Sequence, residues 1–102
     1  AILITAPNAP EAEIAKLTGR LRGVLMARKY VLVDYDVPSD KLEAAIAISP
    51  GFEAPTVTPL HGSDWHAVRV MVPRSEMNHV MDDLYDVGAR AILTTELLAV
   101  RV

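Results

Sequence analysis

Apolar residues recur with two different periods along the chain, and the change of period separates helices from strands. Residues 11–29 carry apolar side chains every three or four positions, which predicts a helix. Over residues 30–37 the period falls to two, which predicts a strand with two distinct faces, and residues 65–72 repeat that alternation. A short β-prone run at residues 1–5, followed by prolines, predicts one further strand before the first helix.

Proline and glycine mark where the intervening elements begin and end. The Pro-Ser-Asp segment at residues 38–40 predicts a helix start, and the Pro-Gly pair at residues 50 and 51 predicts its end. Residues 56–61 predict a strand that its prolines confine to a sheet edge, because proline cannot donate a ladder hydrogen bond. A hairpin loop at residues 62–64 is expected to join it to the next strand.

The last helix has the clearest pattern. Ser75 is expected to cap its N-terminus, its apolar positions continue to Val87, and Gly88 stands at the C′ position that ends such a helix. Residues 91–102 predict a closing strand that is apolar on both faces. Because both faces need cover, this strand favours assembly into an oligomer.

The element order from Lys29 onward is βαββαβ, which predicts an α+β, ferredoxin-like sandwich with two helices on one face of an antiparallel sheet. Residues 1–28 are interpreted as a strand and helix linking this domain, residues 29–102, to a preceding region. One helix layer covers only one face of a sheet, so the other face must meet solvent, a partner or a ligand.

Composition narrows the function classes. The 102 residues, 51% of them apolar, suffice for one small core, and a net charge of −3 with five scattered aromatic residues argues against nucleic-acid binding. The absence of cysteine suits a cytoplasmic protein. The apolar runs are far shorter than the ~20 residues of a membrane span, so no membrane partner is expected. The chain lacks an initiator Met, which suggests a fragment.

Two small clusters of polar residues could carry chemistry. Asp34 and Asp36 would stand about 6.8 Å apart on one strand face, where they could hold a metal or act as an acid/base pair. Alternatively both are solvated, or Asp36 caps the next helix. His61 and His66 flank the hairpin loop and could bind a metal, but they are more typical of a polar surface. No phosphate-binding loop, nucleophile elbow or zinc motif is present, and we predict no catalytic residue and no metal ligand.

Several segments resemble one family. Residues 27–38, ARKYVLVDYDVP, resemble the start of the C-terminal regulatory domain of long-form ATP phosphoribosyltransferase. Residues 49–60, SPGFEAPTVTPL, are similar to its Thr-Pro-Gly-Leu-x-x-Pro-Thr-Val-Ser-Pro-Leu stretch, and residues 65–69, WHAVR, to its Trp-Val-Ala-Val-Arg strand. The resemblance continues through residues 88–93, GARAIL, and runs from about Leu21 to the end of the chain.

The resemblance implies a function. In that family this ferredoxin-like domain, related in shape to the PII nitrogen-regulatory proteins, binds L-histidine as a feedback inhibitor of the first step of histidine biosynthesis. The parent enzyme is a hexamer that joins ATP to phosphoribosyl pyrophosphate with Mg²⁺, using two upstream catalytic domains. The phosphoribosyl-binding loop is not in this sequence, so we expect the chain alone to have no cofactor and no transferase activity.

The resemblance also implies five L-histidine-binding residues. Asp36 would bind a cationic group, Thr56 would offer its hydroxyl, and Ala91 would offer backbone contacts from a neighbouring subunit. Phe52 and Met71 would form an apolar wall where the family usually has leucine. The alternative is a purely structural oligomerisation module without ligand sensing, and an enzymatic use of the Asp34/Asp36 pair is a third hypothesis.

Overall fold

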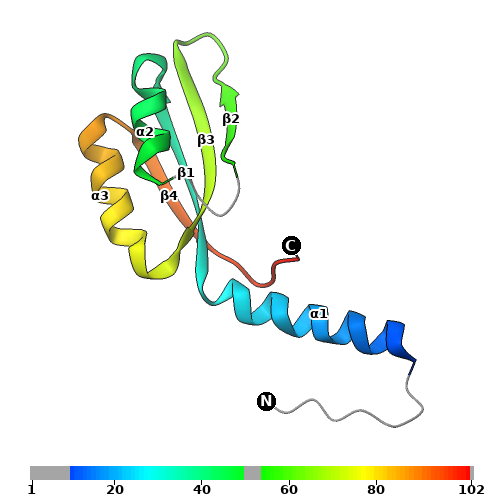
Figure 1. Cartoon of the computed structure of the whole chain (residues 1–102). Helices are drawn as coiled ribbons and strands as arrows, with labels where there is room; N and C mark the ends of the chain where they lie inside the picture. The colour runs from blue at the N-terminus through cyan, green and yellow to red at the C-terminus, as the bar shows by residue number, and fades with distance from the viewer. Residues whose placement is uncertain (1–9, 50–53, 102) are drawn as a thin grey trace.

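The structure is a computed structural model that describes residues 10–49 and 54–101 (Figure 1). The strand expected at residues 1–5 lies outside these ranges. The helices and strands, with two short 3-10 turns η1 and η2, follow the expected order. They are α1 (Glu11–Ala27), β1 (Tyr30–Pro38), η1 (Ser39–Lys41), α2 (Leu42–Ile48), β2 (Thr56–Pro59), β3 (Trp65–Pro73), η2 (Arg74–Glu76), α3 (Met77–Val87) and β4 (Arg90–Glu96).

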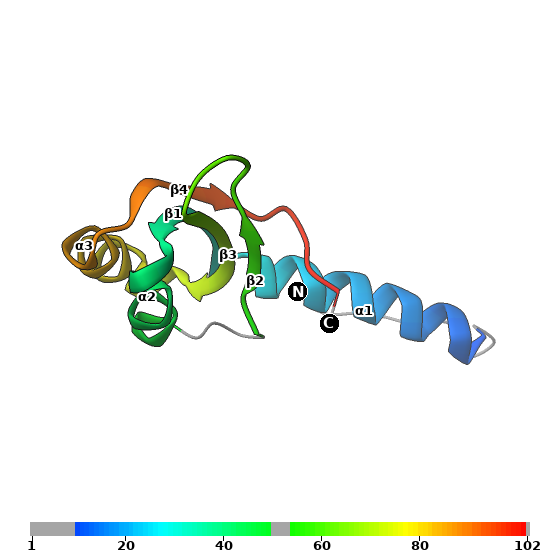
Figure 2. The same ribbon diagram turned by 90° about the horizontal axis from the view of Figure 1, so that it is seen from above.

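The four strands form one antiparallel sheet in the order β2-β3-β1-β4. Helices α2 and α3 lie side by side on one face of this sheet, and the other face is open (Figures 1 and 2). This arrangement confirms the predicted α+β, ferredoxin-like fold. The central strands β1 and β3 pair along their full length, from Tyr30 opposite Pro73 to Pro38 opposite Trp65.

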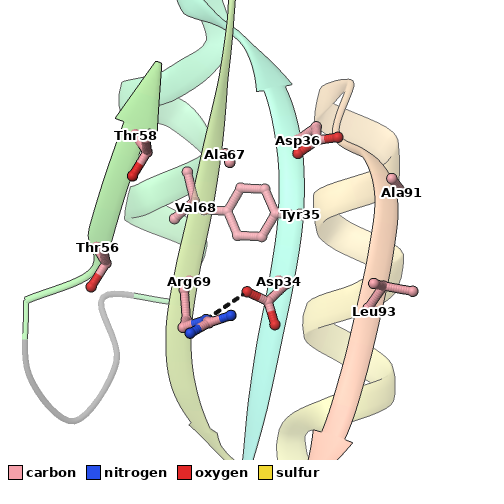
Figure 3. Close-up of a pocket in the computed structure, with 10 residues that line it drawn as sticks. All are labelled: Asp34, Tyr35, Asp36, Thr56, Thr58, Ala67, Val68, Arg69, Ala91 and Leu93. Carbon is pink, nitrogen blue, oxygen red and sulfur yellow. Dashed lines mark hydrogen bonds and ion pairs between the residues drawn. The ribbon is translucent and has the colours of Figure 1, made fainter. Parts of the chain in front are cut away.

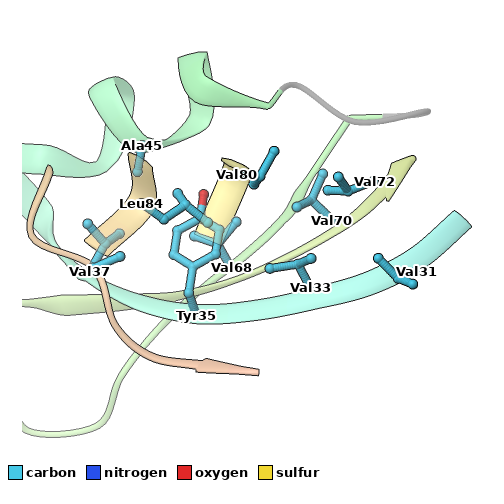
Figure 4. Packing of buried hydrophobic residues seen from close by; sticks show 11 residues of the cluster. Val31, Val33, Tyr35, Val37, Ala45, Val68, Val70, Val72, Val80 and Leu84 are labelled. Atoms are coloured by element: carbon cyan, nitrogen blue, oxygen red, sulfur yellow. The ribbon is translucent and has the colours of Figure 1, made fainter. Parts of the chain in front are cut away.

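The core lies between the sheet and the two helices, as the period-two patterns predict (Figure 4). Alternate residues of β1 are buried there, while their neighbours face the open side. The core consists mainly of Val31, Val33, Tyr35 and Val37 from β1, Val68, Val70 and Val72 from β3, and Ala45, Val80 and Leu84 from the helices. Consequently Asp34 and Asp36 are on the open face, opposite the helices.

The ends of α3 are only partly as predicted. Gly88 has a left-handed backbone, with φ 115°, and its N–H donates to the Tyr85 carbonyl while the Ala89 N–H donates to the Leu84 carbonyl, which is a Schellman motif. The prediction of Ser75 as N-cap is wrong. Pro73 ends β3 directly before the 3-10 turn η2, so Ser75 lies inside that turn and α3 has no side-chain cap.

The final strand is shorter than predicted: β4 ends at Glu96, and the residues after it continue away from the sandwich and lie beside α1 (Figures 1 and 2). The Val100 N–H donates to the Gly23 carbonyl at 3.1 Å. A methyl group at Gly23 would overlap the Val100 carbonyl oxygen, so this helix position requires glycine. Beyond this contact α1 projects from the sandwich, and Leu17, Leu21 and Leu25 are exposed along it.

Candidate functional site

The open face of the sheet carries a hollow of about 590 Å³ that all four strands line (Figure 3). Its volume is within the ~300–1,000 Å³ typical of small-ligand sites. The residues that line it are Asp34, Tyr35, Asp36, Thr56, Thr58, Ala67, Val68, Arg69, Ala91 and Leu93. Tyr35 and Val68 belong to its floor, since their side chains pack into the core.

The hollow exists because small side chains flank Asp36. In the β1–β3 register Asp36 lies opposite Ala67, whose methyl group leaves the space above the sheet open. On the other side the wall is Ala91, again a methyl group. Side chains of two neighbouring strands would otherwise meet across such positions. The Asp36 carboxylate therefore lies beside an open volume rather than against a neighbour.

The two carboxylates of β1 differ in their partners. Arg69 lies opposite Asp34 in the register, and its Nε donates to Asp34 Oδ1 at 2.8 Å (Figure 3). In the described part of the chain no side chain pairs with the Asp36 carboxylate. The guanidinium compensates one negative charge, so the hollow keeps one uncompensated carboxylate, at Asp36.

A β-bulge shapes the β4 wall. Asp34 pairs with Leu93 and Asp36 with Arg90, so two steps along β1 oppose three along β4. Ala91, inside this bulge, has φ 52°. An L-residue with a left-handed backbone is uncommon, and such positions are concentrated at functional sites. The wall of the hollow thus contains strained backbone beside the uncompensated carboxylate.

The structure brings together three of the five residues expected to bind an effector. Asp36, Thr56 and Ala91 line the same hollow from three different strands of one chain. This differs from the expectation that Ala91 would reach the site from a neighbouring subunit. Met71 lies on the open face of β3, opposite Leu32, but does not line the hollow. Phe52 lies outside the described residues.

In the described residues, neither the helix cap considered for Asp36 nor a metal site is formed. Helix α2 and the turn η1 have no side-chain cap, so Asp36 is not a helix cap. The Nδ1 atom of His66 lies 2.9 Å from the Ser39 hydroxyl oxygen, which in turn donates to the Asp64 carbonyl. Within residues 10–49 and 54–101, no group of three or more His, Asp or Glu side chains could hold a metal ion.

Sequence reasoning missed several residues of the site. Arg69 could have been found by pairing the two alternating strands, which places it opposite Asp34. Thr58 and Leu93 share strand faces with Thr56 and Ala91, so the period of two would also have found them. The bulge at Ala91 has no signal in the sequence, because alanine shows no preference for left-handed backbone.

Comparisons with known proteins give a consistent result. The sequence model of a family described as "HisG, C-terminal domain" matches residues 27–99. An ATP phosphoribosyltransferase of Bifidobacterium longum (strain NCC 2705) is 55% identical, over the whole chain and 37% of that relative. ATP phosphoribosyltransferases of Arthrobacter sp. (strain FB24) and Streptomyces coelicolor are 55% and 53% identical, over 95% and 90% of the chain and 34% and 32% of the relatives.

The chain therefore spans about a third of the length of the curated relatives that it matches. None of the helices in its described residues combines the length and the apolar character needed to cross a membrane.

Proposed function

The chain belongs to the family of HisG C-terminal domains, and on this premise we propose that it is the regulatory part of an ATP phosphoribosyltransferase of histidine biosynthesis. In this proposal the hollow on the open sheet face binds L-histidine, which inhibits the enzyme. The catalytic chemistry, with ATP, phosphoribosyl pyrophosphate and Mg²⁺, belongs to the remaining two-thirds of the protein, in the cytoplasm. The chain alone has no transferase activity.

The observation that carries the proposal is the uncompensated carboxylate of Asp36 beside the hollow, next to an Asp34 that Arg69 already neutralises. L-Histidine offers an ammonium group and an imidazole N–H, and either can make a charge-assisted hydrogen bond to Asp36. The hydroxyl groups of Thr56 and Thr58 line the opposite side and can donate to the ligand carboxylate. A zwitterionic ligand fits this distribution of charge.

The hollow is open, so we propose that a second subunit completes it. Leu93 on its β4 wall is 62% exposed, and β4 is an edge strand. Met71 lies on the same open face outside the hollow, and we propose that it adds apolar surface to the assembled site. A ligand shifts an equilibrium only through different affinities for its states, so a site at a subunit boundary lets L-histidine change the geometry of a hexamer.

The exposed residues of α1 fit the catalytic domains as a partner. Leu17, Leu21 and Leu25 form one apolar stripe on the helix that precedes most of the family match. An exposed stripe of this kind marks an interface. We propose that α1 packs against the catalytic part of the same enzyme and connects it to the regulatory sandwich.

The alternative is a purely structural oligomerisation module, and the exposure of Leu93 and of the α1 stripe favours assembly in either case. Isothermal titration of the full-length protein with L-histidine separates the two. The regulatory proposal expects saturable heat and a parallel loss of transferase activity, with no binding of L-alanine, which lacks the imidazole. A titration without saturable heat would refute L-histidine binding and support the purely structural oligomerisation module.

A further inference from the structure

The bulge at the start of β4 holds Ala91 in a backbone conformation that alanine rarely adopts. In residues 10–49 and 54–101 Ala91 is the only residue other than glycine with a positive φ. The left-handed region places the Cβ atom of an L-residue too close to a carbonyl oxygen. Such a residue keeps this conformation only where the surrounding structure restrains it.

The side chain of Arg90 supplies a restraint directly before Ala91. Its Nη1 atom donates to the Ala89 carbonyl at 2.7 Å and to the Tyr85 carbonyl at 3.1 Å, and its Cζ lies 4.1 Å from the centre of the Tyr85 ring. The Tyr85 carbonyl is itself fixed, because it also accepts the Gly88 N–H that ends α3. We call these contacts of Arg90 the α3 latch.

The α3 latch also affects the charge of the hollow. Arg90 is the register partner of Asp36 across β4 and β1. In a regular antiparallel pair such partners share one face of the sheet, but the bulge at Ala91 interrupts the pairing here. The guanidinium instead contacts the last turn of α3, and the Asp36 carboxylate has no partner in the described part of the chain.

We propose that Arg90 is a positioning residue for the ligand in the hollow. By binding the last turn of α3 it holds Ala91 in the left-handed conformation and keeps its own charge away from Asp36, so the hollow is preformed for a cationic group. The proposal rests on the proposed function, in which that ligand is L-histidine. Without the latch Ala91 returns to extended backbone, and a ligand must restore the bulge before it binds.

The test compares three variants of the full-length protein with the wild type in calorimetric titrations with L-histidine. Arg90→Ala lowers the affinity about 5- to 30-fold, which corresponds to the left-handed strain of one alanine. Arg90→Ala with Ala91→Gly restores the affinity, because glycine adopts this backbone without a steric penalty. Arg74→Ala is the control, because Arg74 also donates to a backbone carbonyl, that of Arg28, and to the carboxylate of Glu96 in β4. This variant leaves the L-histidine affinity unchanged.

Hydrogen–deuterium exchange over residues 88–93, measured without ligand on the same proteins, gives a second readout. Exchange is faster in Arg90→Ala and returns to the wild-type rate when Ala91→Gly is added. The proposal is overturned if Arg90→Ala has the L-histidine affinity and the exchange rate of the wild type. It is also overturned if adding Ala91→Gly restores neither the affinity nor the slow exchange. A wild type that does not bind L-histidine refutes the proposed function, whereas the exchange rates still decide whether Arg90 holds Ala91.

Discussion

At the scale of single residues, the two carboxylates of β1 differ in their partners, because Arg69 pairs with Asp34 and no described side chain pairs with Asp36. Replacing Asp36 by Asn keeps the shape of the side chain and removes the charge beside the hollow. We expect L-histidine affinity to fall about 10- to 150-fold, since a hydrogen bond to a charged group contributes roughly 1.5–3 kcal/mol. Titration calorimetry on the full-length protein measures this loss.

The matched control for Asp36→Asn is Asp40→Asn, an identical change at an exposed carboxylate of η1 that lines no part of the hollow. It should leave the affinity unchanged. Asp34→Asn removes the partner of Arg69. Its L-histidine affinity shows how far a charge elsewhere in the hollow affects binding. Similar losses from Asp36→Asn and Asp40→Asn would refute the direct role of Asp36.

Burial raises the pKa of the Tyr35 hydroxyl from 10.0 to about 12, and the residue is only 3% exposed. Above about pH 10 the unfolded chain releases this proton while the folded chain retains it. The free energy of unfolding is therefore unaffected by Tyr35 below pH 10 and falls as the pH rises toward 12, by up to roughly 3 kcal/mol.

Denaturant unfolding of the wild type and of Tyr35→Phe at increasing alkaline pH measures this effect. Tyr35→Phe keeps the buried ring and should lose less stability between about pH 10 and pH 12. Tyr85→Phe, at an exposed tyrosine, should behave like the wild type. The same pH dependence in all three proteins would contradict a buried, neutral Tyr35 hydroxyl.

At the scale of elements, the two glycines of α1 make different contacts with the chain end. A methyl group at Gly23 would overlap the Val100 backbone, whereas one at Gly19 would meet only the end of the flexible Arg101 side chain, at 2.8 Å. Alanine improves helix propensity at both sites by about 1 kcal/mol. We expect Gly19→Ala to raise the melting temperature and Gly23→Ala to release the chain end and forfeit that gain.

Thermal melts, with hydrogen–deuterium exchange over residues 97–101, compare the two variants. Faster exchange of this segment in Gly23→Ala alone is the expected result. If both variants melt at the same temperature and exchange alike, the contact between Val100 and α1 does not contribute to stability.

The regular elements could be predicted from the sequence, and the irregular contacts could not. The alternation of Val31, Val33 and Val37 reports a half-buried strand directly, because burial and side-chain direction share one period. Asp36, Thr56 and Ala91 came from a family resemblance, and the topology brings them to one hollow. No local pattern encodes the left-handed Ala91, since it lies in a bulge that forms where β4 pairs with the distant strand β1.

The end of β4 illustrates the same limit. Residues 97–102 have a strand-like composition, and their alternation predicted a longer β4. Val100 instead bonds to Gly23, far away in the sequence, and this tertiary contact overrides the local preference.

At the scale of the whole molecule, the isolated chain leaves apolar surface uncovered on the sheet face and on α1. The structure extends 59 × 26 × 18 Å, and Leu93 is exposed on the edge strand β4. We expect the chain to self-associate, with light scattering reporting more than a monomer at tens of micromolar, in order of magnitude.

Leu93→Glu should shift the isolated chain toward the monomer, because it places a charge in the uncovered apolar patch. Thr95→Glu, at an exposed polar position of the same strand, is the control and should have less effect. A wild-type chain that is monomeric at these concentrations would show that the uncovered face does not drive assembly by itself.

L-Histidine binding in the hollow on the open sheet face is the hypothesis on which the proposed function depends. A crystal structure of the full-length protein with bound L-histidine tests it most directly. We expect the ligand between Thr56 and Ala91, with a ligand nitrogen within hydrogen-bonding distance of the Asp36 carboxylate. L-Histidine bound elsewhere in the protein, with this hollow empty, would contradict it.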